Sequence, residues 1–280
     1  EAGVDCDFAE EPTDWLAQPE AVEAVTAPVA LPPELPPVQS PLERALVRED
    51  LPRIGGDPQG WPFSSIAKWE AEAAAVRLQF VSGTHAIAAA LYGVLRPGDR
   101  LLALTGRPYD TLEEVIGIRG SGQGSLAEFG IAYDELDLLA DGSVDEAGIA
   151  GALALPTRMV LIQRSCGYSW RPSLTVEQIG RLVERVKAIQ PGCLVFVDNC
   201  YGELVELQEP TAVGADLMAG SLIKNLGGTI APTGGYVAGR AELVEQACCR
   251  LTAPGIGSEG GTGFDQVEQQ LQQIRMRLAC

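Results

Sequence analysis

Two kinds of hydrophobic pattern follow each other repeatedly along the central part of the chain. Short continuous apolar runs are typical of buried strands, and they occupy residues 78–81, 100–104, 132–138, 158–163, 194–197, 215–219 and the end of 229–239. Helical composition or spacing covers residues 69–77, 86–95, 112–118, 143–153, 176–189 and 240–250. Strands and helices that alternate in this way predict an α/β fold, in which a mostly parallel, mixed sheet carries helices on both faces.

The two ends of the chain depart from this pattern. Residues 1–69 hold more than half of the 19 prolines and a clear acidic excess, so we expect a poorly ordered leader there. Residues 263–280 are rich in Gln and have a helical pattern, but they stop without a second domain. We therefore expect one large domain over residues 70–262, between the leader and the truncated start of a C-terminal region.

Composition argues against several classes of function. The net charge of −18 does not suit nucleic-acid binding, because a polyanion requires clustered Lys and Arg. No apolar run approaches the roughly 18 to 20 residues that cross a bilayer, and the acidic first residues are unlike a secretory signal. Seven cysteines without a CxxC pair indicate reduced thiols, so we expect a cytoplasmic protein. An organelle stays open as an alternative, because the chain does not begin with Met.

Two chemically useful side chains follow apolar runs in the second half of the chain. Asp198 ends the run at 194–197, and Lys224 follows the run at 215–219, shortly before a glycine-rich turn. A lysine at the end of a buried strand suits nucleophilic amine chemistry better than a solvated surface role. Pyridoxal phosphate requires such a pair, since a carboxylate keeps its ring nitrogen protonated and an amine forms a Schiff base with it. The sequence therefore predicts a pyridoxal phosphate site at this edge of the sheet.

Further candidates lie at the same predicted edge. The turn formed by Ser82, Gly83 and Thr84 opens a helix, where backbone N–H groups and hydroxyls suit a phosphate, although an ordinary helix cap explains the same residues. Tyr109 follows a strand, where its ring could stack on a planar cofactor or simply pack. Arg164 follows the run at 158–163 and is either an anion holder or a surface charge.

Other kinds of chemistry are less well supported. Ser221 and Lys224 form an S-x-x-K motif, but its companions S-D-N and K-T-G are missing, and two glycines follow where that motif opens a long helix. The chain has one histidine, His85, so a zinc site is not expected and we predict no metal. A Ser-His-Asp triad would have to use His85, and no G-x-S-x-G motif accompanies it.

Several long stretches carry a resemblance to a known family. They are FVSGTHAIAAALYGVLRPGD, GRPYDTLEEVIGIRG, GSLAEFGI, IQRSCGYSWRPSLT, FVDNCYGELVE, EPTAVGADLMAGSLIKN and GGTIAPTGGYVAGR. Over residues 70–261 the chain closely resembles the aluminium-resistance, methionine gamma-lyase-like family of pyridoxal phosphate enzymes, and less closely the cystathionine lyases. The resemblance implies the large domain of the type I pyridoxal phosphate-dependent transferases.

The resemblance also implies roles for individual residues. Lys224 would be the Schiff-base lysine and Asp198 the partner of the ring nitrogen. The phosphate would lie among Ser82, Gly83, Thr84 and Ser221, and the ring would stack on Tyr109. Arg164 and Tyr201 are the candidates for binding the substrate.

A carbon–sulfur lyase acting on a sulfur-containing amino acid is the activity that the resemblance implies. Whether the substrate undergoes β- or γ-elimination stays open, and a dimer or tetramer is expected. The family's N-terminal segment and C-terminal domain have no counterpart here, so we expect a shortened form. The alternative is a catalytically impaired protein of the same fold with a metal-tolerance or interaction role.

Overall fold

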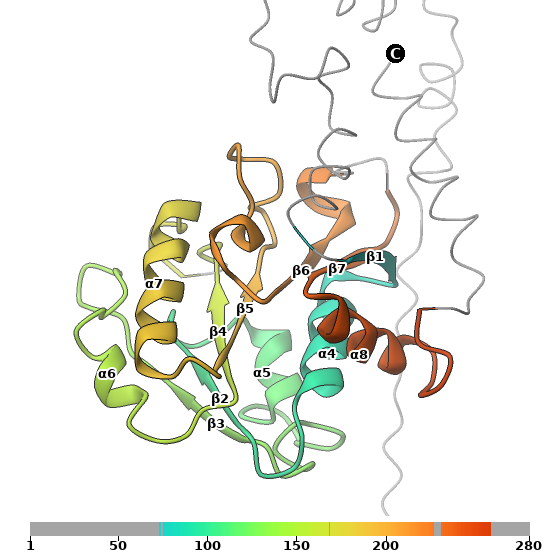
Figure 1. Ribbon diagram of the computed structural model, residues 1–280, viewed down its shortest axis with the longest axis horizontal. Helices are drawn as coiled ribbons and strands as arrows, with labels where there is room; N and C mark the ends of the chain where they lie inside the picture. Colours follow the sequence, from blue (N-terminus) through green and yellow to red (C-terminus); the bar gives the residue numbers. More distant parts are fainter. Residues whose placement is uncertain (1–72, 74, 168, 227–230, 259–280) are drawn as a thin grey trace, which may run out of the picture.

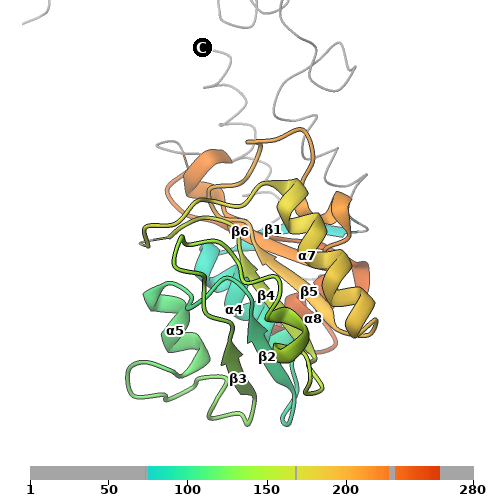
Figure 2. The ribbon, with the colours of Figure 1, turned by 90° about the vertical axis from the view of Figure 1, so that its left-hand side faces the viewer.

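The computed structural model describes residues 73, 75–167, 169–226 and 231–258 (Figures 1 and 2). Its central element is a seven-stranded sheet with the order β1-β7-β6-β5-β4-β2-β3. The strands are β1 (Ala75–Phe80), β2 (Arg100–Ala103), β3 (Ala132–Glu135), β4 (Met159–Gln163), β5 (Leu194–Asp198), β6 (Leu217–Ser221) and β7 (Gly235–Gly239). The two expected terminal segments, 1–69 and 263–280, lie outside the described residues.

Strand direction confirms the predicted mixed, mostly parallel sheet. The five strands from β3 to β6 pair in parallel, whereas β7 is antiparallel to both of its neighbours, β6 and β1. All strands except β7 therefore run the same way, and their carboxyl ends meet at one edge. In sheets of this kind ligands bind outside that edge.

Helices cover both faces of the sheet, as the alternating pattern predicts (Figure 1). The helices are α4 (Gly83–Val94), α5 (Asp110–Ile116), α6 (Ile149–Ala152), α7 (Val176–Ile189) and α8 (Ala241–Leu251), with single turns at η3 (Pro210–Val213) and η4 (Leu222–Leu226). Helices α4, α5 and α8 belong to one buried apolar cluster, and α6 and α7 belong to another.

Each central strand contributes to both clusters because successive side chains of a strand point to opposite faces. Leu161 and Phe196 pack in the cluster with α4, whereas Val160 and Val197 pack in the cluster with α7. This is why β4 and β5 are continuous apolar runs rather than alternating ones. No helix in the described part of the chain is long and apolar enough to cross a membrane.

One helix follows its sequence signals closely. The predicted range 176–189 is the observed range of α7, and Thr175 caps its start. The Gln178 N–H donates to Thr175 Oγ1 at 3.1 Å, and the Thr175 N–H donates to Gln178 Oε1 at 2.8 Å. Two orphan N–H groups are thus satisfied by side chains that are local in sequence, which is why the prediction succeeds.

One predicted helix is wrong where the structure describes it, and another is shorter than predicted. Ala75 to Arg77, expected in a helix over 69–77, belong to β1 and pair with β7 from Gly239 to Val237. Pairing with a distant strand overrides the helix propensity of an Ala-rich stretch. The predicted helix 143–153 is reduced to α6, because Asp145 Oδ1 accepts the Gly148 N–H at 2.9 Å and closes a turn before it.

Candidate active site

The first part of the site is the junction between β1 and α4. Ser82 is the helix cap, and its Oγ accepts the His85 N–H at 3.1 Å. The N–H groups of Gly83 and Thr84 lie in the first turn, where a helix offers no internal acceptor. A Cβ atom added to Gly83 would stand 2.9 Å from the Cβ of Ser221, so only glycine allows this close approach to the end of β6. These groups together form a surface that suits a phosphate.

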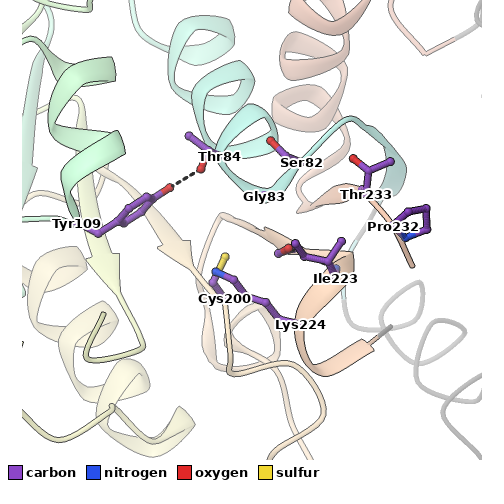
Figure 3. A pocket seen from close by; sticks show the side chains of 11 residues that line it. Ser82, Gly83, Thr84, Tyr109, Cys200, Ile223, Lys224, Pro232 and Thr233 are labelled. Atoms are coloured by element: carbon purple, nitrogen blue, oxygen red, sulfur yellow. Dashed lines mark hydrogen bonds between the residues drawn. The ribbon is translucent and has the colours of Figure 1, made fainter. Parts of the chain in front are cut away.

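A pocket opens at this junction (Figure 3). Its lining is Ser82, Gly83, Thr84, Tyr109, Cys200, Ser221, Ile223, Lys224, Pro232, Thr233 and Gly234. The structure therefore brings together most of the residues that the sequence singled out, from segments that follow β1, β2, β5 and β6. Their chemical roles stay predictions.

Tyr109 is fixed at one wall of the pocket. Its hydroxyl shares a hydrogen bond of 3.1 Å with Thr84 Oγ1, which Figure 3 draws as a dashed line. Its backbone N–H donates at 3.1 Å to Oε1 of Gln163, the last residue of β4. Burial raises the pKa of the Tyr109 hydroxyl, and the charge of Asp198 raises it further. The ring is therefore neutral and anchored at both ends, as a stacking surface needs to be.

Asp198 ends β5 and is 2% exposed. Its Oδ1 accepts the Cys200 N–H at 3.1 Å. Burial raises the pKa of this carboxyl, while the positive charges of Lys224 and Arg171 act in the opposite direction. Asp198 is not part of the pocket lining, but its charge interacts with Tyr109 and Lys224, which are. A cation bound in the pocket would stabilise its ionised form.

Lys224 lies at a kink inside η4. Its Nζ is 4.2 Å from the centroid of the Tyr201 ring, which is a cation–π contact. Tyr201 adopts a left-handed backbone conformation with φ of 66° and is half exposed beside the site. Asn225 Nδ2 donates to the Tyr201 carbonyl at 2.8 Å and fixes the two segments to each other. The predicted role of Tyr201 in substrate binding remains a prediction.

Arg164 differs from both expectations, since it neither lines the pocket nor lies on the surface. It is 3% exposed, with ion pairs of 2.7 Å to Glu206 and 3.5 Å to Glu209. It also donates to Asn199 Oδ1 and to the Gly202 carbonyl, both at 2.8 Å. The carboxylates that pair with Arg164 follow it by more than forty residues, so the sequence pattern could not show them. Its donors hold the loop after β5 in place.

Cys200 is a pocket residue that sequence reasoning missed. It is 6% exposed, and burial and the nearby charge of Asp198 raise the pKa of its thiol, which is therefore neutral. Its position two residues after Asp198, in the same strand-end loop, is the signal that could have found it. Five cysteines in the described part of the chain are free thiols, and no cluster of His, Cys, Asp or Glu suited to a metal occurs there.

Comparison with known proteins gives a consistent result. The family model described as methionine gamma-lyase matches residues 63–277. The uncharacterized protein YnbB of Bacillus subtilis is 52% identical over 202 residues, which are 72% of this chain and 48% of YnbB. A carbon–sulfur lyase involved in aluminium resistance from Clostridium novyi is 50% identical, with a TM-score of 0.66 over 72% of this chain and 49% of that structure.

A more distant solved structure extends the comparison. The cystathionine gamma-synthase of Xanthomonas oryzae pv. oryzae, determined in complex with cystathionine, is 26% identical, with a TM-score of 0.54. The match covers 76% of this chain and 49% of that structure. The chain thus spans about half the length of the relatives it matches.

Proposed function

Because this chain belongs to the methionine gamma-lyase family, we propose that it is a pyridoxal phosphate-dependent carbon–sulfur lyase acting on a sulfur-containing amino acid. Its sheet and helices are those of the type I pyridoxal phosphate enzymes among its structural neighbours. The observation that carries the proposal is one pocket where Lys224 lies opposite the start of α4 and interacts with a buried carboxylate, Asp198.

The residues around the pocket fit this cofactor. Gly83 and Thr84 offer backbone N–H groups, and Ser221 offers a hydroxyl, at the place where glycine alone allows α4 and β6 to meet. Tyr109 would lie against the ring. Burial raises the pKa of the Asp198 carboxyl, which means that its ionised form lacks enough positive charge nearby. A protonated ring nitrogen would supply that charge.

The chain's own residues then have distinct tasks. When bound, pyridoxal phosphate supplies an aldehyde that bonds to amines and a protonated ring that accepts an electron pair. Lys224 Nζ is the amine that would hold the cofactor's aldehyde. The same Nζ would accept the proton from the substrate's α-carbon and would give it to the departing sulfur, which then leaves as a thiol. Asp198 would keep the ring nitrogen charged throughout.

The substrate class is the finer part of the proposal. Its support is the name of the Clostridium novyi relative as a carbon–sulfur lyase and the cystathionine bound to the Xanthomonas oryzae enzyme. A cytoplasmic location and assembly as a dimer or tetramer belong to the same proposal. Their support is the family relationship.

A reduction experiment tests cofactor binding. The purified chain of 280 residues is mixed with pyridoxal phosphate, the visible absorbance band is recorded, and borohydride is added. We expect mass spectrometry to find the pyridoxyl group on Lys224. Lys224→Ala should abolish the labelling, and the control Lys187→Arg, which keeps a cation beside Asp216, should leave it unchanged. Equal labelling of the wild type and Lys224→Ala would contradict the proposal.

A product assay then tests the reaction. Cystathionine, methionine and cysteine are supplied in turn, and the release of thiol and ammonia is measured. Release from one of them that disappears in Lys224→Ala supports a lyase. Cofactor attachment without any release favours instead a catalytically impaired protein of the same fold.

A further inference from the structure

Glu203 is a buried carboxyl next to the proposed site that the reaction does not use. It lies in the loop after β5 and is 1% exposed. Its Oε1 accepts the Ser221 N–H at 3.3 Å and the Tyr236 hydroxyl at 3.4 Å. Its Oε2 is buried without a hydrogen-bond partner. A Cβ atom on Gly220 would stand 2.5 Å from Glu203 Oε1, so the carboxyl fills the space that this glycine leaves.

Glu203 contacts both ends of the segment that carries Lys224. Its carboxyl binds the backbone of Ser221, which precedes η4. Its carbonyl accepts Asn225 Nδ2 at 3.1 Å, on the residue that directly follows Lys224. The position of Lys224 therefore depends on a residue that does not line the pocket itself.

The groups that face the Glu203 carboxyl are acidic or neutral. Asp198 lies on β5, Glu209 in the same loop as Glu203, and Tyr236 on β7. Cys200, also in this loop, interacts with it electrostatically. Among the ion pairs of the described residues, none includes Glu203.

The balance of these interactions favours the neutral acid. Burial raises the pKa of Glu203 to about 7 against the hydrogen bonds from the N–H groups of Glu203 and Ser221, which lower it, and the charges of Asp198 and Glu209 contribute to the rise. A negative charge on this carboxyl would leave a carboxylate oxygen buried without a partner, which is costly. The ionised carboxylate would become hydrated if the structure around it opened, and hydration would lower this cost.

We propose that Glu203 is a pH-sensitive positioning residue, which as a neutral acid fixes residues 221–225 with Lys224 and on ionisation loosens them. The inference rests on the proposed function only for its catalytic consequence, namely a lysine that is correctly placed at neutral and lower pH. Its structural content concerns the chain without cofactor and is tested there.

The test compares the reactivity of two lysines in the chain of 280 residues without cofactor. Acetic anhydride labels amines, and mass spectrometry gives the rates at Lys224 and Lys187. Lys187 is the internal reference, because it is held on α7 by Asp216 at 2.6 Å and by the Cys193 carbonyl at 2.7 Å. The ratio of the two rates removes the ordinary pH dependence that both amines share.

In the wild type we expect the Lys224 to Lys187 ratio to rise severalfold as the pH passes through about 7. In Glu203→Gln, which keeps an oxygen acceptor but cannot ionise, the ratio should stay flat over the same range. Parallel profiles in the two proteins overturn the proposal. Because no cofactor is present, this outcome is independent of whether borohydride attaches pyridoxal phosphate to Lys224.

Denaturant unfolding supplies a second measurement. The pKa of Glu203 is about 7 in the folded chain against 4.5 for an ordinary glutamate, so the wild type loses stability as the pH rises from about 4.5 to 7 and levels off above that. Glu203→Gln should lack this loss. At pH 8 the change in its ratio of folded to unfolded chain, relative to pH 4.5, should therefore be more favourable than that of the wild type by about tenfold or more. If Glu203→Gln does not fold, the wild-type labelling profile decides alone, and a profile without a midpoint near pH 7 overturns the proposal.

Discussion

Two neighbouring strands of this sheet end in buried ionisable side chains that differ in how fully other protein groups compensate their charge. Arg164 directly follows β4 and Asp198 ends β5, and the Arg164 N–H donates to the Asp198 carbonyl at 3.0 Å. Arg164 is surrounded by protein acceptors, including the carboxylates of Glu206 and Glu209. Asp198 is contacted by the backbone N–H and the side chain of Cys200 and by the charges of Lys224 and Arg171, and no carboxylate–cation ion pair of Asp198 occurs among the described residues.

Arg164 and Asp198 have nearly the same location and burial, so the difference between them lies in their hydrogen-bond and ion-pair partners. A charge that the protein satisfies fully holds a loop in place, whereas a charge that it satisfies only partly is ready for a ligand. Both residues looked like site candidates from their positions after apolar runs. The contacts place Arg164 in the scaffold and leave Asp198 as the proposed partner of a cofactor.

The largest effect is expected from Arg164→Met. Removing the guanidinium breaks the ion pairs of 2.7 Å to Glu206 and 3.5 Å to Glu209, so the free energy of unfolding should fall by about 3–5 kcal/mol. Denaturant unfolding measures this loss. The matched control is Arg181→Met, whose exposed pair with Glu177 is worth at most about 0.5 kcal/mol. A variant with normal stability but weakened substrate binding would restore Arg164 as a substrate residue.

Asp198→Asn, in contrast to Arg164→Met, should lower turnover without lowering stability. It keeps the shape of the side chain but removes the charge that holds the ring nitrogen protonated, so turnover should fall by about 10²–10³-fold. Because burial raises the pKa of Asp198, the wild type loses stability as the pH rises above 3.8, the ordinary value. Asp198→Asn lacks that loss and should be at least as stable at neutral pH. If Asp198→Asn lost stability but kept normal turnover, Asp198 would be the structural residue and not the partner of a cofactor.

Ligand-dependent stability sharpens the contrast. Pyridoxal phosphate at about 100 times its Kd should stabilise the wild type by about 2.7 kcal/mol, because it binds only the folded chain. Arg164→Met should gain the same increment from a lower starting point, whereas Asp198→Asn should gain less at equal ligand concentration. Thermal unfolding with and without cofactor gives these increments. An increment that Asp198→Asn retains in full would show that the carboxylate does not contribute to binding.

Tyr109→Phe is expected to have the smallest effect. It removes the hydroxyl with its hydrogen bond of 3.1 Å to Thr84 and keeps the ring, so stability should fall by about 1 kcal/mol. Cofactor affinity should change little, and Tyr109→Ala is the matched variant that removes the ring and should weaken binding more. Cofactor titration by absorbance separates the two. Equal affinities in both variants would argue against stacking on Tyr109.

Sequence reasoning succeeded where the determining contacts are local. The start of α7 depends on Thr175 and Gln178, which are three residues apart. It failed for Ala75 to Arg77, because β7 lies far along the chain and cannot be inferred from an Ala-rich segment. It also placed Ser82, Tyr109 and Lys224 at one edge correctly, since the carboxyl ends of parallel strands must meet.

The sequence by itself determined the α/β fold class and the edge of the sheet at which several candidate residues meet, because the patterns of strands and helices are local properties of the chain. Only the tertiary structure decided which charges are compensated. It paired Arg164 with Glu206 and Glu209, and it left Glu203 buried behind Ser221 with one oxygen unpartnered. The physical reason is that the energy of a buried charge depends on neighbours that folding brings from distant segments.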